Sequence, residues 1–289
     1  MKFDMILVVT GDDFKNLELV VRNSKLYIKP DKIYIISPLA HINKNIKKFK
    51  NEEKLIWVDE RDILDIKEIN FNQANLLDMP ERKFWYYQQF LKMAFSYSSH
   101  CLKGHYLIWD ADTIPLKKMR FFDENGKIYL TSSKYEYHND YYHNIKVLLG
   151  EDMGIYSKSF ISQHLMVSKK DMLSLIERLG SLDNAKWINL LLSKIDGKSQ
   201  SLFSEYETYC NFVLNEYTNS YNVRELEWFR KGAYLTKVHS VKKLSKYYFY
   251  IAIEKTDKSI VNFFIYNTIH LLNMLKHFFL KYRNYSPFP

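Results

Sequence analysis

The stretch that decides the fold is Tyr-Leu-Ile-Trp-Asp-Ala-Asp-Thr at residues 106–113. Its apolar, largely strand-favouring first half predicts a buried strand that ends at two carboxylates. On a strand, residues two apart point the same way, so Asp110 and Asp112 are expected to converge. Two carboxylates this close repel each other unless a cation lies between them, and oxygen ligands favour Mg²⁺ or Mn²⁺. A strand end with an ordinary acidic turn is the alternative, because a three-letter motif arises easily by chance.

Three further predicted strands precede this stretch, at residues 5–10, 33–36 and 55–58, and an amphipathic helix at 14–28 follows the first. The alternation predicts an α/β fold with a mixed, mostly parallel sheet flanked by helices. Ligands of such sheets gather at the strand carboxyl ends. The polar residues at these ends are Thr10, Asp13, Ser37, Asp59 and Glu60. Taken singly, each is better explained as a loop residue or helix cap, but together they outline one rim of the sheet.

A predicted helix at residues 80–98 leads into the acidic strand. Trp85, Gln88, Gln89 and Lys92 occupy one stripe of it, at helical spacing. An aromatic ring, two amides and a lysine suit a sugar or nucleotide ligand. A packed interface with the next element is the alternative.

After the acidic strand, residues 127–130 are expected to continue the sheet. Residues 135–144 alternate aromatic or His side chains with polar ones, and predict either a mobile loop over a site or a surface excursion. Residues 160–168 alternate like a strand, with His164 on one face. Helices are predicted at 171–180 and 184–194.

Ser204 and Glu207 match the capping box S-x-x-E at the start of another helix. This explains Glu207 structurally and leaves Glu205, in the first helical turn, as a candidate base. Complementing the helix dipole is the alternative role for Glu205. Downstream, Arg230 lies in a predicted loop, and His239 is placed to reach a metal ion.

The composition limits the function further. The chain has 289 residues with 23 Tyr, 19 Phe and only 8 Gly, and it has no Gly-rich phosphate loop. Two cysteines and the lack of a predicted signal peptide favour the cytoplasm. The net charge of +9 implies an anionic partner. Because the charge is not concentrated in one arm, we do not expect a nucleic-acid partner.

The character of the chain shifts at residue 246, and residues 246–289 form a predicted C-terminal amphipathic helical extension. Residues 259–280 are apolar on most sides but interrupted by Asn, Lys and His, which argues against a membrane crossing. The helix fits a membrane interface, where it would be peripheral, or a docking contact with the catalytic domain or with a second subunit in a homodimer.

Together these residues resemble the GT-A class of nucleotide-sugar glycosyltransferases, in particular the bacterial DUF6492-like group. The resemblance covers about residues 3–240. It rests on the helix at 85–92, the D-A-D at 110–112, the segment 204–207 and the late His239. It implies a GT-A, Rossmann-like catalytic domain at residues 1–245, with a nucleotide-binding half at 1–113 and an acceptor half at 114–245.

The resemblance also implies site roles. Donor contacts would come from Thr10, Asp13, Ser37, Asp59, Trp85, Gln88, Gln89, Lys92 and Asp110. Asp110, Asp112 and His239 would hold Mn²⁺ or Mg²⁺. Glu205 would be the base of an inverting transfer, whereas in a retaining member no base is required and Glu205 would only bind the acceptor. Acceptor contacts would come from His164, Glu207 and Arg230. The donor would be a UDP-sugar, and the acceptor a glycan or lipid-linked glycan of a capsule or lipopolysaccharide, at the inner face of the cell membrane.

Two other functions fit the same residues. A haloacid-dehalogenase-like phosphatase would use Asp110 as nucleophile and Asp112 as acid/base. Three strands before the motif and short downstream spacing argue against it. A non-catalytic, membrane-associated protein that binds nucleotide-sugars without turnover is the other alternative.

Overall fold

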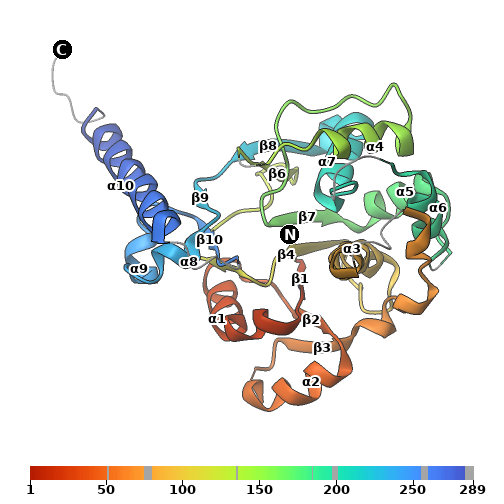
Figure 1. The fold of residues 1–289 in the computed structure, drawn as a ribbon, viewed down its shortest axis with the longest axis horizontal. Helices are drawn as coiled ribbons and strands as arrows, with labels where there is room; N and C mark the ends of the chain where they lie inside the picture. The colour runs from red at the N-terminus through yellow and green to blue at the C-terminus, as the bar shows by residue number, and fades with distance from the viewer. Residues whose placement is uncertain are drawn as a thin grey trace. The chain divides into compact units, whose positions relative to one another are not determined.

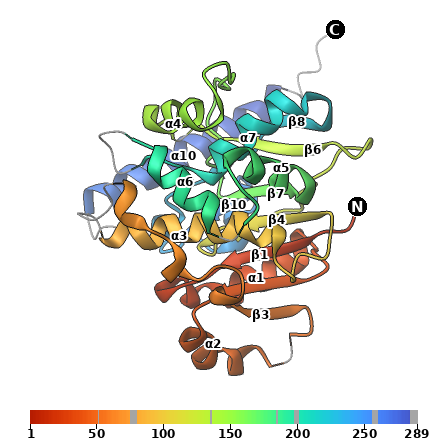
Figure 2. The ribbon, with the colours of Figure 1, turned by 90° about the vertical axis from the view of Figure 1, so that its right-hand side faces the viewer.

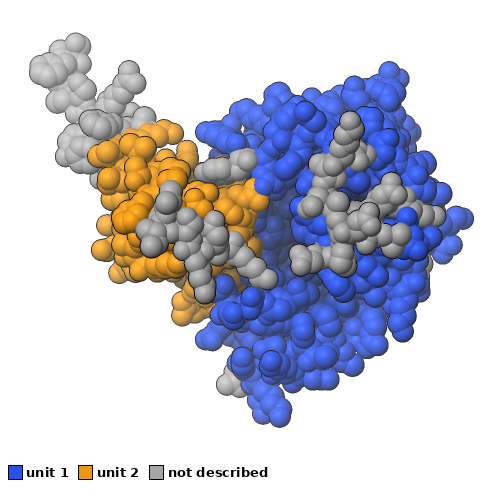
Figure 3. Space-filling view, in the orientation of Figure 1, with its two compact units in different colours: residues 1–18, 30–111, 120–225 blue, residues 19–29, 112–119, 226–289 orange. Residues whose placement is uncertain are grey.

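A computed structural model describes residues 1–50, 52–74, 80–134, 136–183, 185–196, 201–254 and 260–283. Predicted segments that include residues 135, 184 and 255–259 therefore lie partly outside the described residues. The chain forms two compact units, coloured separately in Figure 3. Unit 1 comprises residues 1–18, 30–111 and 120–225. Unit 2 comprises residues 19–29, 112–119 and 226–289.

Unit 1 is built on a five-stranded sheet of order β3-β2-β1-β4-β7 (Figure 1). Its strands are β1 (Asp4–Val8), β2 (Ile33–Ser37), β3 (Leu55–Asp59), β4 (His105–Trp109) and β7 (His164–Ser168). The first four are parallel and β7 is antiparallel to β4. Every residue of β1 and β2 is buried, as their continuous apolar runs require in a sheet covered on both faces. The predicted mostly parallel sheet is confirmed.

Helices flank this sheet, which confirms the predicted α/β class. Those of unit 1 are α2 (Leu39–Asn45), α3 (Pro80–Ala94), α4 (Asn139–Leu149), α5 (Lys169–Leu179), α6 (Lys186–Lys194) and α7 (Glu205–Glu216). Short 3₁₀ helices lie at Gly11–Lys15, Ile46–Phe49, Glu60–Asp62, Ile66–Glu68, Phe71–Ala74, Phe95–Tyr97 and Thr218–Ser220. Helix α3 contacts β1 and α7, and α5 contacts β7, α6 and α7 (Figure 2). Helix α7 therefore joins α3 and α5 in one helical layer.

Two predictions about unit 1 are wrong. Strand β6 (Ile128–Ser132) does not continue the main sheet, because it pairs in parallel with β8 (Tyr221–Glu225) in a separate two-stranded sheet. Residues 139–149 form α4 rather than a loop, and Tyr141 and Tyr142 are buried. Helix α4 contacts α7, α6 and α5, and the Tyr142 hydroxyl donates to Glu207 of α7, so the buried tyrosines belong to the packing of this layer.

Unit 2 has its own three-stranded sheet, of order β5-β10-β9. Strand β10 (Tyr250–Ala252) lies in the middle, antiparallel to β5 (Thr113–Pro115) and parallel to β9 (Trp228–Phe229). The helices are α8 (Gly232–Leu235), α9 (Val241–Leu244) and α10 (Ile260–Arg283), while α1 (Leu17–Tyr27) starts in unit 1 and continues in unit 2. The sheet therefore joins three distant stretches of the sequence.

Helix α10 confirms the helical part of the predicted C-terminal extension (Figure 1). The extension is not helical throughout, because its residues 250–252 form strand β10. Among the described residues, no helix combines the length and apolar character that a membrane crossing requires. The predicted boundaries at residues 113 and 245 refer to functional parts of the chain, not to compact units. They stay predictions.

Candidate functional site

The order of the strands marks one edge of the main sheet. From β1 the chain runs outward through β2 to β3, and then returns to place β4 on the other side of β1. Ligands of open α/β sheets bind beyond the carboxyl ends of the strands at such a reversal. Thr10 follows β1 and Asp110 follows β4. Gln88 of α3 donates to Thr10 Oγ1 over 3.2 Å, so this stripe of α3 reaches the same edge.

Asp110 lies just after β4, and the strand alternation expected for Asp110 and Asp112 is wrong. Strand β4 ends at Trp109 and residues 111–112 form a turn. The backbone N–H of Asp110 donates to the carbonyl of Gln163 over 3.0 Å. Gln163 has a φ of 65°, a left-handed conformation that few non-glycine residues adopt. A strained backbone therefore fixes Asp110 in place.

Lys92 joins two carboxylates. Its Nζ lies 2.6 Å from Asp110 Oδ1 and 2.7 Å from Glu205 Oε1. The Glu205 side chain is only 3% exposed, whereas that of Asp110 is 21% exposed. One ammonium therefore serves two carboxylates, and the three ionised groups together carry one excess negative charge. Glu205 is the buried member and Asp110 the one that faces solvent.

The protonation of this cluster follows from burial and charge. Burial favours a lower pKa for Lys92, but the charges of Asp110 and Glu205 outweigh it and raise the pKa above the ordinary value. Lys92 therefore stays charged at neutral pH. Burial raises the pKa of Glu205, and Lys92 opposes this.

Helix α7 supplies the remaining groups of the cluster. Ser204 Oγ accepts from the Glu207 N–H, so the predicted capping box is confirmed on its serine side. Gln89 Oε1 accepts from the Glu205 N–H over 3.1 Å, which ties the start of α7 to α3. The Tyr206 hydroxyl donates to Asp110 Oδ1 over 2.8 Å, and its ring lies 4.9 Å from Lys92 Nζ.

Tyr206 is a site residue that the sequence analysis missed. It lies between Glu205 and Glu207, which identified the segment as a candidate. In a chain rich in aromatic residues, one more tyrosine gives no indication of a functional role. We name the group of Lys92, Asp110, Glu205, Tyr206 and Gln89 the lysine cluster.

Other predicted donor contacts lie at the carboxyl ends of β1, β2 and β3. Ser37 is fully buried and donates to the Val9 carbonyl over 2.8 Å, so its hydroxyl already has a structural partner. Asp59 accepts from the Arg61 guanidinium, which holds its pKa below the usual range. Asp13 lies in the 3₁₀ helix after β1, and is half-buried. Their roles stay predictions.

Trp85, on the same stripe of α3, is half-buried. It has the Arg82 guanidinium 4.6 Å from its ring, and it contacts Tyr86 edge-on. Its donor contact stays a prediction.

The predicted acceptor residues of unit 1 are buried. His164 is 2% exposed and stacks on Trp109. Its Nε2 lies 3.0 Å from Thr131 Oγ1 and its Nδ1 lies 3.0 Å from the Ser162 carbonyl, while burial lowers its pKa to about 3. Both ring nitrogens are therefore used inside the protein, which counts against acceptor binding. Its role stays a prediction.

Glu207 is also fully buried. Its Oε1 accepts from the Phe160 N–H over 3.0 Å and from the Tyr142 hydroxyl over 3.4 Å. Burial raises its pKa to about 7, against the opposing hydrogen bonds. Its acceptor role stays a prediction, and its contacts are those of a structural residue.

The remaining predicted residues belong to unit 2. Asp112 Oδ1 accepts from the Thr113 hydroxyl over 3.2 Å, and its carbonyl accepts from the Ile253 N–H. The His239 ring lies 4.8 Å from that of His270. Arg230 donates to Glu254 over 2.6 Å. No group of three or more His, Cys, Asp or Glu side chains able to hold a metal ion occurs among the described residues.

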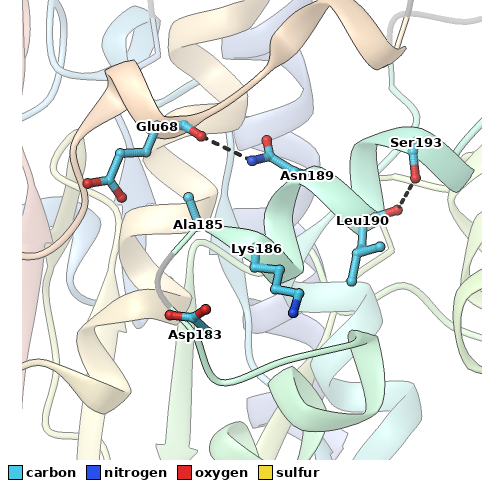
Figure 4. Close-up of a pocket in the computed structure, with 7 residues that line it drawn as sticks. All are labelled: Glu68, Asp183, Ala185, Lys186, Asn189, Leu190 and Ser193. Atoms are coloured by element: carbon cyan, nitrogen blue, oxygen red, sulfur yellow. Dashed lines mark hydrogen bonds between the residues drawn. The ribbon is translucent and has the colours of Figure 1, made fainter.

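A surface hollow of about 400 Å³ lies elsewhere in unit 1 (Figure 4). Its wall includes α6 residues, and Asn189 donates to the Glu68 carbonyl across it. The lining residues are Glu68, Asp183, Ala185, Lys186, Asn189, Leu190 and Ser193. None of them is a predicted site residue, so this hollow is not the site that the strand order marks.

A family model described as "Family of unknown function (DUF6492)" matches residues 1–259, most of the chain. The chain belongs to the DUF6492 family. The sequence resemblance to DUF6492 is therefore confirmed. No curated protein sequence matches this DUF6492 chain.

Two solved structures are similar to the DUF6492 chain. One is the apo crystal structure of mouse xyloside xylosyltransferase 1, 10% identical with a TM-score of 0.45, covering 87% of this chain and 97% of that one. The other is the galactosyltransferase LgtC in complex with donor and acceptor sugar analogues. It is 9% identical with a TM-score of 0.43, covering 88% of this chain and 87% of that one.

Proposed function

We propose that the chain is a glycosyltransferase that moves a sugar from a nucleotide-sugar donor to a glycan acceptor. The observation that carries the proposal is the lysine cluster at the reversal of the main sheet. The edge where α/β sheets bind nucleotides presents a partly exposed carboxylate, a buried ammonium and a tyrosine hydroxyl bound to each other.

The cluster suits a step in which negative charge develops on a departing diphosphate. Lys92 is held in its charged form by Asp110 and Glu205. A fixed cation in a water-poor site stabilises developing charge without having to reorganise. Since the ammonium is already shared by two carboxylates, Lys92 would mainly position Asp110, and a further cation would neutralise the donor.

We propose that this cation is Mn²⁺ or Mg²⁺, held by Asp110 and Asp112 with His239 as the further candidate. One or two carboxylates with substrate phosphates are a usual ligand set for Mg²⁺. Because no group of three or more His, Cys, Asp or Glu side chains able to hold a metal ion occurs among the described residues, the donor diphosphate would have to supply the other ligands. Such an ion supplies Lewis-acid stabilisation of the leaving group.

The predicted base, Glu205, has a specific constraint. Its side chain is 3% exposed and its Oε1 accepts from Lys92. To deprotonate an acceptor hydroxyl it would first have to part from that ammonium. We therefore assign Glu205 as a positioning residue that holds Lys92 and the start of α7, and the inverting mechanism that needs a base stays a prediction.

The donor test uses UDP-, GDP-, CMP- and dTDP-sugars with Mn²⁺ or EDTA, and follows nucleotide release. We compare the wild type with Asp110→Asn and Asp112→Asn, and use Asp183→Asn at the unrelated hollow as the control. We expect release from one donor, dependent on metal, lost in both D-A-D variants and kept in the control.

Two outcomes would overturn the proposal. Release of phosphate from simple phosphomonoesters, without donor turnover, would assign Asp110 to a phosphatase. Metal-dependent nucleotide affinity with no sugar release would identify a binding protein. We further propose a UDP-sugar as donor and a lipid-linked glycan at the inner membrane face as acceptor, which the donor panel and glycan-carrying vesicles would test.

A further inference from the structure

Helix α10 differs from an ordinary surface helix in which of its sides is buried. A globular helix normally turns its apolar face to the core and its polar face to water. In the described part of α10 the buried side carries His270, and half-buried Tyr266 and Asn273 lie on that side as well. The outward side carries most of the exposed apolar side chains of the helix, together with exposed Thr268 and Lys276.

The inward side of α10 is held by polar and aromatic contacts within unit 2. The His270 ring is 3% exposed, and its Nδ1 lies 2.9 Å from the Tyr248 hydroxyl. Asn273 donates to the same hydroxyl over 3.2 Å. The Tyr266 ring stacks on that of Tyr234, with centroids 5.2 Å apart. These contacts fix which side of the helix faces outward.

The outward side is a stripe of six large apolar side chains, each between 38% and 65% exposed. They are Phe264, Ile265, Ile269, Leu271, Leu272 and Leu275. At 3.6 residues per turn they cover about 160° of the helix circumference. We call this surface the α10 stripe. Exposed Thr268 and Lys276 lie within the same arc, but six large apolar side chains gathered on one side of a helix mark an interaction site rather than scattered surface residues.

The charge of unit 2 indicates what covers the stripe. Unit 2 contains 16 Lys and Arg and four Asp and Glu, a net charge of +12. Unit 1 holds the other 26 basic and 29 acidic residues, a net charge of −3. The positive charge of the protein therefore resides in the unit that carries the stripe. Lys242 and Lys243 of α9 and Lys276 of α10 are exposed.

We propose that the α10 stripe inserts into the interfacial region of an anionic lipid bilayer, with unit 2 as the membrane-binding unit. An apolar helix face that lies in the interface, combined with basic residues, binds anionic bilayers through both area and charge. A second copy of this chain, with the same net charge of +12 on unit 2, would meet charge repulsion. The inference is independent of whether the chain transfers a sugar.

The test is co-sedimentation of the full chain with vesicles. One set contains equal parts phosphatidylglycerol and phosphatidylcholine, and the other contains phosphatidylcholine alone. We expect the wild type to bind the anionic set at least about tenfold more strongly, and to lose most of this difference in high salt. Lys242→Glu/Lys243→Glu should weaken binding to the anionic set only.

Phe264→Ser/Leu272→Ser should lower binding about tenfold or more, because it removes the apolar contact. The matched control, Leu39→Ser/Leu102→Ser, removes equally exposed apolar side chains from unit 1 and should bind as the wild type does. Circular dichroism checks that each variant is folded.

Three outcomes would overturn the proposal: no binding to either vesicle set, equal binding to both, or equal loss in the unit 1 control. A dimer in sedimentation analysis that the stripe variant dissociates, without vesicle binding, would assign the stripe to a second copy instead.

Discussion

Helices α3 and α10 both bury polar side chains, but they do so with different chemistry. In α3, Lys92 is buried as a charge, between two carboxylates. In α10, His270 is buried and neutral, because burial and neighbouring His239 lower its pKa to about 4. The first arrangement concentrates charge at a sheet edge, while the second leaves an apolar surface outside.

The largest expected effect comes from removing the buried charge of Lys92 in α3. Lys92→Met leaves the Asp110 and Glu205 carboxylates without their shared cation, so unfolding free energy should fall by about 3–5 kcal/mol. Denaturant titration followed by tryptophan fluorescence measures the loss. Lys15→Met, at a side chain that is 75% exposed, is the control and should stay within about 0.5 kcal/mol.

The double variant Lys92→Met/Glu205→Gln should recover part of the loss, because it also removes one of the orphaned charges. A loss below about 1 kcal/mol for Lys92→Met would mean that the lysine cluster is accessible to water, and would weaken the contrast with α10.

The second effect concerns Glu207, whose pKa is raised from 4.5 to about 7. Between these values the folded state binds the proton more tightly than the unfolded state, so the wild type loses stability as pH rises through this range. Glu207→Gln removes the titration. Between pH 5 and pH 8 the wild type should lose about 2–3 kcal/mol relative to this variant.

Denaturant titrations at the two pH values measure this difference, with exposed Glu177→Gln as the control. If the wild type lost no more stability between the two pH values than Glu207→Gln does, Glu207 would be ionised in the folded protein throughout this range, in conflict with its burial.

The smallest expected effect concerns the two sides of α10. Tyr248→Phe removes the hydroxyl that contacts His270 and Asn273, and should cost about 1–2 kcal/mol, because buried polar groups lose their partner. Leu272→Ser, on the outward face, should stay within about 0.5 kcal/mol. If Leu272→Ser proved the more costly of the two, α10 would be packed the other way round.

Local sequence patterns predicted the elements that depend on neighbouring residues. The apolar runs gave the first four strands of the main sheet, and the S-x-x-E spacing gave the start of α7. Pairing between distant strands carries no local signal, so β6 was assigned to the wrong sheet. The alternation argument for Asp110 and Asp112 failed because the turn after Trp109 ends the strand.

The sequence identified several residues of the candidate site by their type and position, but it did not predict which of them contact each other. Lys92, Glu205 and Gln89 were identified separately, and nothing in the sequence joined them across more than 110 residues. Tyr206 carried no distinctive signal. The charge distribution was not predicted. The excess of basic over acidic residues becomes evident only when residues 19–29, 112–119 and 226–289 fold into one unit.

The small sheet of unit 2 has a consequence for synthesis of the protein on the ribosome. Strand β5 begins one residue after Asp112, but its partner β10 is made more than 130 residues later, and Ile253 supplies the N–H that holds the Asp112 carbonyl. Such distant pairing forms late. The second carboxylate of D-A-D therefore receives its support only once residue 253 has been made, so a chain terminated before that residue would lack it. Shortening the protein at residue 245 would likewise remove the middle strand of this sheet together with α10.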